Sequence, residues 1–183
     1  VGEIADLQQK IQILTAAAQK NIDWPRLLAL FDRPAPMAPA VQAAAPTVRI
    51  AVAQDEAFCF TYAETLESLQ AAGAELCYFS PLRDAALPQH IGGLYLPGGY
   101  PELYAAQLAT NTAMRSAVKT AVESGLPTVA ECGGFLYLNR LLSDGEGREW
   151  PMAGALPGRA ANTGRLGRFG YATLTARRDG LLC

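Results

Sequence analysis

The 183-residue sequence lacks a long apolar run and a recognisable targeting signal. No stretch reaches the roughly 18 apolar residues that a helix needs to span a membrane. The first residues, VGEIADLQQK, do not follow the basic-then-apolar order of a secretory signal peptide. The sequence therefore predicts a cytoplasmic protein that has no membrane among its partners.

An excess of positive charge is also missing. The chain has 15 lysines and arginines against 17 aspartates and glutamates, which gives a net charge of −2. Proteins that bind nucleic acid usually present a basic face to the phosphate backbone. The composition therefore gives no reason to expect a nucleic-acid partner.

Cysteine and histidine are few and widely spaced. The cysteines are Cys59, Cys77, Cys132 and Cys183, and none belongs to a CxxC pair. This spacing indicates neither a zinc site nor a disulfide framework, so we expect reduced thiols and no bound metal. The single histidine is His90.

Hydrophobic residues make up 50% of the chain, enough to bury the core of one globular domain.

Residues 1–32 predict two helices, because apolar residues recur at helical spacing and Asp23 and Pro25 suit the start of the second helix. Two such helices cannot bury their apolar faces alone, so we expect them to be the end of an upstream domain. A helical hairpin packed on the rest of the chain is the alternative. Residues 33–46, rich in Pro and Ala, predict an extended linker.

From residue 47 onward, strands and helices alternate. Short apolar runs predict strands at 48–53, 75–79, 93–96 and 127–131, and helices are predicted at 61–73 and 111–125. This order implies right-handed crossovers and therefore a mostly parallel sheet. We expect an α/β fold with a flavodoxin-like open, mostly parallel sheet flanked by helices. Ligands of such sheets bind beyond the carboxyl ends of the strands.

The segment PTVAECGGFLYL predicts a buried strand that turns sharply into a helix at Cys132. A nucleophile on such a turn crowds its neighbours, and Gly133 and Gly134 provide the small residues that the turn needs. The helix start favours a thiolate, and the Gly133 N–H lies where an oxyanion would form. Cys132 is therefore a candidate nucleophile. The alternative is a small buried cysteine in an ordinary strand-to-helix turn.

An oxyanion site needs a second donor, and the loop LPGGYPE, residues 96–102, is the candidate. Gly98 and Gly99 let its backbone approach a substrate closely, and we expect the amide of Gly99 or Tyr100 to donate. A plain Pro/Gly turn before a helix that starts at Pro101 is the alternative reading.

A thiol nucleophile normally needs a histidine as its base. His90 precedes the third predicted strand, at the edge of the sheet opposite Cys132, so we interpret it as a solvated loop residue. The base is then missing from these 183 residues.

Three segments follow one another in the second part of the chain: DEAFCFTYAETLESLQAAGAELCYFSPLRDAALP (55–88), GLYLPGGYPELYAAQL (93–108) and VAECGGFLYL (129–138). In this order and spacing they resemble the cobyrinic acid a,c-diamide synthase family, and the similarity covers about residues 47–178. The Asp-x-Ala-Phe opening and the Phe-Ser-Pro-Leu-x-Asp segment are more specific than the strand-to-helix turn, because generic amidotransferases lack them.

The resemblance implies that residues 47–183 form a class I-type glutamine amidotransferase domain that is incomplete at its C-terminus. In that family an N-terminal P-loop domain uses ATP and Mg²⁺ to activate corrin-ring acetate carboxylates, and residues 1–32 resemble its last helices. The partners implied are glutamine, a corrinoid polycarboxylate and the chain's own N-terminal ATP domain, and a homodimer is compatible with this. By resemblance, Cys132 attacks the glutamine amide while Gly133 and the glycine loop hold the oxyanion.

The sequence departs from the family pattern in three ways. Pro97 stands where the family often has a third glycine, no Walker A sequence is present, and the family's catalytic histidine would follow the strand at 168–174, beyond Cys183. Five arginines in residues 151–183 suggest a corrinoid-attracting surface, although a solvated loop explains them as well.

Other functions stay open on the sequence. An amidase of a related tetrapyrrole, such as nickel sirohydrochlorin a,c-diamide synthase or cobyric acid synthase, belongs to the same class. A non-catalytic or redox-sensing domain on the same scaffold belongs to a different one.

Overall fold

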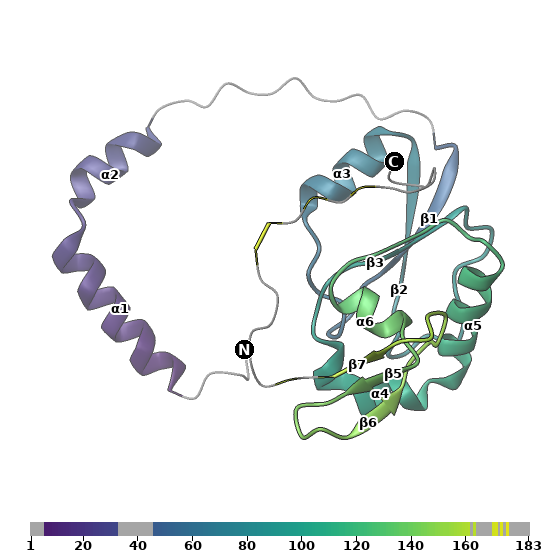
Figure 1. Ribbon diagram of the computed structural model, residues 1–183. Helices are drawn as coiled ribbons and strands as arrows, with labels where there is room; N and C mark the ends of the chain where they lie inside the picture. Colours follow the sequence, from purple (N-terminus) through teal and green to yellow (C-terminus); the bar gives the residue numbers. More distant parts are fainter. Residues whose placement is uncertain are drawn as a thin grey trace. The chain divides into compact units, whose positions relative to one another are not determined.

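The structure is a computed structural model that describes residues 6–32, 46–161, 163, 170, 171, 173 and 175 (Figure 1). It divides into two compact units, residues 1–40 and residues 41–183. Within the described residues, no helix is both long and apolar enough to cross a membrane.

The first unit contains the two expected helices, α1 (Leu7–Asn21) and α2 (Trp24–Phe31). Asp23 caps α2, because its carboxylate accepts a hydrogen bond from the Arg26 N–H at 3.2 Å, and a proline occupies the first turn as predicted. Large apolar side chains on both helices are exposed; among them are Ile13, Leu14, Leu28, Leu30 and Phe31. The helices therefore carry apolar faces that the unit itself does not cover. The predicted linker falls almost entirely on residues 33–45, outside the described part of the chain.

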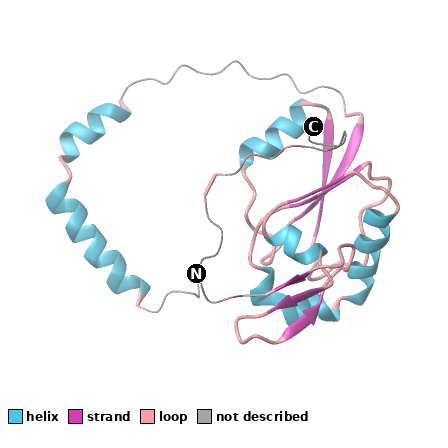
Figure 2. Cartoon of the chain, in the orientation of Figure 1, coloured by secondary structure: helices cyan, strands magenta, loops and turns pink. Residues whose placement is uncertain are grey.

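The second unit is built on a four-stranded sheet with the order β2-β1-β3-β4. The strands are β1 (Val48–Ala53), β2 (Ala74–Phe79), β3 (Gly93–Leu96) and β4 (Thr128–Ala130). All three pairings are parallel, which confirms the predicted flavodoxin-like α/β fold. Figure 2 shows this sheet with helices beside it.

Two helices connect neighbouring strands, as predicted. They are α3 (Ala63–Ala71), between β1 and β2, and α5 (Thr112–Glu123), between β3 and β4. The two connections run in opposite directions across the sheet, so right-handed crossovers place α3 and α5 on opposite faces (Figure 1). Asn111 caps α5 by accepting a hydrogen bond from the Met114 N–H at 3.3 Å. Gly73 and Gly125, with φ of 92° and 89°, follow the two helices in the left-handed conformation that favours glycine.

The core lies between the sheet and the helices that cover it. Its largest fully buried side chains include Phe58, Leu96, Leu108, Met114 and Tyr137. Phe58 and Tyr137 meet edge to face, with ring centroids 5.4 Å apart. The core therefore joins the loop after β1 to the helix after β4, two segments that are far apart in the sequence.

Several short elements complete the unit. They are a 3₁₀ helix, η1 (Pro101–Tyr104), the helices α4 (Ala105–Thr110) and α6 (Gly133–Leu138), and the strands β5 (Leu141–Ser143), β6 (Glu149–Pro151) and β7 (Arg159–Ala160). The helix after Cys132 was expected, and a helix starting at Pro101 was part of the alternative reading of the glycine loop. The small sheet of order β6-β5-β7 was not expected. Strands of two or three residues are too short to show a hydrophobic period.

Candidate active site

The loops that follow β1, β3 and β4 emerge at one edge of the parallel sheet. The β3–β4 register pairs Leu96 with Ala130, so the loop beginning at Pro97 and the turn at Cys132 leave the sheet together. The loop after β1 reaches the same place, because Phe60 and Gly98 form an antiparallel bridge. The predicted site residues Gly98, Cys132 and their neighbours therefore gather at the carboxyl edge.

Cys132 has the backbone conformation of a nucleophile elbow. Its φ is 44° and its ψ is −109°, a conformation that costs a non-glycine residue about 1–3 kcal/mol. The turn is held from both sides, because the Gly134 N–H donates to the Glu131 carbonyl at 2.7 Å and to the Pro97 carbonyl at 3.0 Å. The Cys132 side chain is exposed, so the thiol can meet a substrate from solvent.

The two glycines after Cys132 allow the elbow to pack against the β3 strand and its loop. A Cβ added at Gly134 would overlap the Leu96 carbonyl oxygen. A Cβ added at Gly133 would lie 2.8 Å from Cδ of Pro101 and 3.0 Å from the amide nitrogen of Gly99. Neither position can accept a side chain without displacing backbone.

Gly98 and Gly99 lie beside the elbow. A Cβ at Gly98 would be 3.7 Å from Cβ of Cys132, and the amide nitrogen of Gly99 lies 3.0 Å from a Cβ built at Gly133. Among the described residues, the N–H groups of Gly99 and Gly133 donate no hydrogen bond within the chain. Two unpaired amides next to a nucleophile are the arrangement that an oxyanion site requires.

The structure distinguishes between the two amides, of Gly99 and Tyr100, that were predicted from the sequence as alternatives for the second donor. The Tyr100 N–H donates to the Ala57 carbonyl at 3.0 Å, so it is already paired within the protein. Gly99 is therefore the better candidate, and Tyr100 borders the site through its half-exposed ring instead. The sequence could not show this difference, because it depends on how the loop after β1 lies against the glycine loop.

Exposed aromatic side chains come from the segments that surround Cys132. Phe60 and Tyr62 follow β1, Tyr100 belongs to the glycine loop and Phe135 to α6, and all four rings are exposed. Phe60 and Tyr62 contact each other edge to face at 6.2 Å. The edge of the sheet that carries Cys132 is therefore also rich in apolar surface.

His90 does not belong to this site. It lies in the turn before β3, so the length of that strand, about 10 Å, separates it from the carboxyl edge. Its neighbours are Arg49 and Glu75, which together with it line a shallow cavity at the amino edge of the sheet. This confirms the prediction that His90 is a loop residue remote from Cys132.

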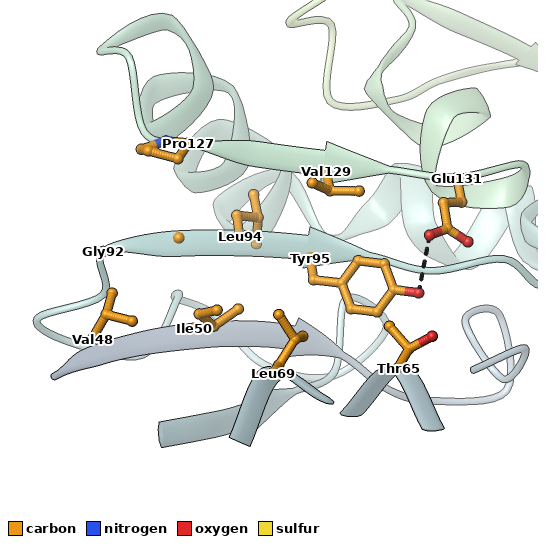
Figure 3. A pocket seen from close by; sticks show the side chains of 11 residues that line it. Val48, Ile50, Thr65, Leu69, Gly92, Leu94, Tyr95, Pro127, Val129 and Glu131 are labelled. Carbon is orange, nitrogen blue, oxygen red and sulfur yellow. Dashed lines mark hydrogen bonds between the residues drawn. The ribbon is translucent and has the colours of Figure 1, made fainter. Parts of the chain in front are cut away.

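A separate cavity of about 510 Å³ lies on one face of the sheet (Figure 3). Apolar side chains of β1, β3, β4 and α3 line most of it, and its polar end is formed by Tyr95 and Glu131. The Tyr95 hydroxyl donates to Glu131 Oε1 at 3.2 Å. Burial, together with the Glu131 charge and this hydrogen bond, raises the pKa of Tyr95 to about 12, so its hydroxyl stays protonated. Cys132 does not line this cavity.

No group of three or more potential metal ligands occurs in the part of the chain that the structure describes. Of the five C-terminal arginines, Arg159 lies on β7 and pairs with Glu149 of β6. The remaining four, at 165, 168, 177 and 178, lie outside the described residues.

Known proteins resemble the chain over almost its whole length. The family of CobB/CobQ-like glutamine amidotransferase domains matches residues 49–179. A cobyrinate a,c-diamide synthase of Dehalococcoides mccartyi is 42% identical over 188 residues, which cover 99% of the chain and 40% of that protein. One of Synechocystis is 43% identical over 175 residues, 93% of the chain and 36% of that protein. A hydrogenobyrinate a,c-diamide synthase of Pseudomonas aeruginosa is 44% identical over 168 residues, 90% of the chain and 37% of that protein. The chain thus spans about two fifths of the length of these relatives.

Proposed function

Because the chain belongs to the family of CobB/CobQ-like glutamine amidotransferase domains, we propose that it releases ammonia from glutamine at Cys132. The ammonia is then used by the longer protein to amidate acetate carboxylates of a corrinoid, as the names of the relatives suggest. The observation that carries the proposal is the strained, exposed Cys132 between the unpaired amides of Gly99 and Gly133.

The geometry supports a two-step reaction. The Cys132 thiolate attacks the carboxamide carbon of glutamine, and the oxygen of the tetrahedral intermediate accepts hydrogen bonds from Gly99 and Gly133. The C–N bond then breaks, the nitrogen takes a proton and leaves as ammonia, and a glutamyl thioester remains. Water hydrolyses the thioester to glutamate and restores the thiol.

The reaction needs a group that accepts and returns protons, and the chain's only histidine is remote from Cys132. We therefore assign the base to a part of the longer protein outside this 183-residue sequence. We assign the binding of ATP and Mg²⁺ to such a part as well. The sequence has no Walker A motif, so its residues do not fit an ATP site, and we assign carboxylate activation to the part of the relatives' length that the chain does not span.

The exposed apolar faces of α1 and α2 fit this assignment. Similarity to the D. mccartyi synthase covers 99% of the chain, so it extends over both helices. We propose that they pack on the ATP-using domain of the longer protein, which would bury side chains such as Leu14 and Phe31. A cytoplasmic location would supply both ATP and the reducing conditions that keep Cys132 a thiol.

The chain offers a matched control for the nucleophile, because Cys59 is also an exposed cysteine on a neighbouring loop. In the full-length protein, Cys132→Ser should lower the rate of glutamine hydrolysis by at least about 1,000-fold, whereas Cys59→Ser should leave it within about twofold. Amidation of cobyrinate with added ammonium salt should persist in both variants. Equal losses in the two variants, or full hydrolysis by Cys132→Ser, would refute the assignment of Cys132.

A further inference from the structure

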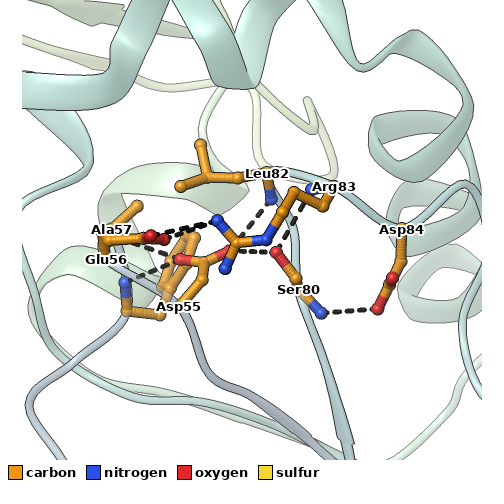
Figure 4. A network of polar contacts seen from close by, with 8 residues as sticks. Asp55, Glu56, Ala57, Ser80, Leu82, Arg83 and Asp84 are labelled. Carbon is orange, nitrogen blue, oxygen red and sulfur yellow. Dashed lines mark hydrogen bonds and ion pairs between the residues drawn. The ribbon is translucent and has the colours of Figure 1, made fainter.

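A buried carboxylate ties together two loops at the carboxyl edge of the sheet (Figure 4). Asp55, in the loop after β1, is only 9% exposed. Its Oδ1 accepts hydrogen bonds from the N–H groups of Ala57 at 2.9 Å and Phe58 at 3.1 Å. Its Oδ2 accepts from the Ser80 hydroxyl at 2.8 Å and the Leu82 N–H at 2.9 Å, both in the loop after β2. Only a carboxylate offers enough lone pairs to satisfy four donors at once.

One of these bonds also orients a carbonyl that holds the glycine loop. The Phe58 N–H and the Ala57 carbonyl belong to the same peptide unit, whose planarity directs them to opposite sides. The Phe58 N–H is shared between Oδ1 and the backbone carbonyl of Asp55, each at 3.1 Å. On the other side of the peptide, the Ala57 carbonyl accepts the Tyr100 N–H at 3.0 Å. Asp55 therefore reaches the glycine loop through a single rigid peptide.

A second bond fixes the peptide that carries the Gly99 N–H. The carbonyl of that peptide belongs to Gly98 and accepts the Phe60 N–H at 3.1 Å. Its N–H must then point away from Phe60, and the Gly99 nitrogen itself lies 3.0 Å from a Cβ built at Gly133, next to Cys132. The peptides that flank Gly99 are thus held by the Phe60 N–H and by the Ala57 carbonyl, and Asp55 holds the peptide that carries the second of these groups.

We propose that Asp55 is a positioning residue that fixes the direction of the Gly99 N–H in the oxyanion site. The inference rests on the proposed glutaminase reaction and names a residue that touches neither glutamine nor Cys132. Because an oxyanion exists only in the transition state and the tetrahedral intermediate, a misdirected Gly99 N–H should lower kcat and leave KM nearly unchanged.

Substitutions at Asp55 should act in a graded way. Asp55→Ala removes all four contacts of the carboxylate and leaves only the Asp55 backbone carbonyl to hold the Phe58 N–H. It should lower the kcat of glutamine hydrolysis by about 10- to 100-fold, at most the loss that removal of one oxyanion donor causes. Asp55→Asn keeps one oxygen for Ala57 and Phe58 but presents an NH₂ group to the Leu82 N–H. It should therefore recover part of kcat.

Two neighbouring carboxylates provide matched controls. Asp84 accepts the Ser80 N–H at 2.7 Å and so holds the same loop after β2, without any bond to residues 57–60. Glu56 is adjacent to Asp55, but its carboxylate is exposed and pairs with Arg83. Asp84→Ala and Glu56→Gln should both keep kcat within about twofold, even where the Asp84 variant unfolds at a lower temperature.

The test measures kcat and KM for glutamine in the full-length protein and, by peptide mass spectrometry, the rate at which iodoacetamide alkylates Cys132. Alkylation forms no oxyanion, so its rate should stay within about twofold in every variant. A kcat loss confined to the Asp55 variants, with unchanged alkylation and KM, supports the inference. An unchanged kcat in Asp55→Ala, or an equal loss in Asp84→Ala, overturns it.

The other possible results distinguish a failure of the inference from a failure of the proposed function. If Asp55→Ala does not fold, Asp55→Asn replaces it, and a wild-type kcat in that variant rejects the positioning role. If the wild-type protein shows no hydrolysis that depends on Cys132, the proposed function fails and the inference falls with it. Wild-type hydrolysis with no response to Asp55 rejects the inference alone.

Discussion

Cys132 combines a strained backbone with an exposed side chain, and the neighbouring glycines make this possible. The strain is held in place by hydrogen bonds of the Gly134 N–H to two carbonyls, one before the elbow and one after β3. The sequence indicated this residue because a strand, a cysteine and two glycines follow one another. It could not indicate that the Tyr100 amide is paired, since that depends on the position of Ala57 in a separate loop.

Gly134 offers a stability test at the residue scale. Gly134→Ala would drive a Cβ into the Leu96 carbonyl, and backbone must move to make room. We expect a loss of about 3 kcal/mol in the free energy of unfolding, which lowers Tm by about 6–12 °C in a domain of this size. Thermal unfolding followed by circular dichroism measures the change. Gly145→Ala is the control, because a Cβ there meets no atom within 4 Å. Equal Tm values for the two variants would contradict the close packing of Gly134 against the Leu96 carbonyl.

At the scale of elements, the sequence predicted the four sheet strands and the two crossover helices within one or two residues at their ends. Runs such as VRIAVA, bounded by turn residues, carry a clear strand signal. The β6-β5-β7 sheet gave no such signal, because its strands contain two or three residues and are defined by contacts rather than by period. The Asp55 network is likewise invisible in a pattern, although the resemblance had drawn attention to its Asp-x-Ala-Phe segment.

The hairpin of β5 and β6 depends on a second carboxylate, Asp144. It accepts hydrogen bonds from the Trp150 indole, the Arg148 guanidinium and the backbone N–H groups of Glu146 and Arg148. The Trp150 bond is the largest cause, and with the Arg148 and backbone bonds it holds the pKa of Asp144 well below the ordinary value of 3.8. The folded hairpin therefore favours the ionised carboxylate.

This shift predicts a pH-dependent effect of Asp144→Asn. Because the folded-state pKa is depressed, the stability that the carboxylate contributes is fully present above the unfolded-state pKa and is lost as pH falls below it. The difference in Tm between wild type and Asp144→Asn should be constant from about pH 7 to 5 and should shrink below about pH 4. Calorimetry across that range measures it. A difference in Tm that widens at low pH would contradict the conclusion that the folded hairpin favours the ionised form of Asp144.

At the scale of the whole molecule, Cys132 and His90 lie at opposite edges of one sheet. The proposed nucleophile and the proposed oxyanion site lie within the 183 residues, whereas the single histidine, His90, does not lie near them. The relatives are about two and a half times as long as the aligned region, which leaves ample chain for a base and for an ATP-using domain. The proposed activity therefore belongs to the longer protein.

We accordingly predict that residues 1–183, purified alone, release ammonia from glutamine at no more than the rate of their own Cys132→Ser variant. Without a base near the thiol, neither the attack nor the departure of the amine is assisted. A coupled assay for ammonia measures both. Robust release by the wild-type chain alone would show that the base lies within these residues.

The role of Cys132 as the glutamine nucleophile can be tested most directly by treating the full-length protein with a glutamine analogue that carries an electrophilic group. Peptide mass spectrometry then locates the adduct. We predict that the analogue modifies Cys132 and spares Cys59, which is also exposed, and that excess glutamine prevents the modification. A redox-sensing cysteine would react without regard to glutamine. Modification of Cys132 that glutamine does not prevent, or preferential modification of Cys59, would contradict the assignment of Cys132 as the glutamine nucleophile.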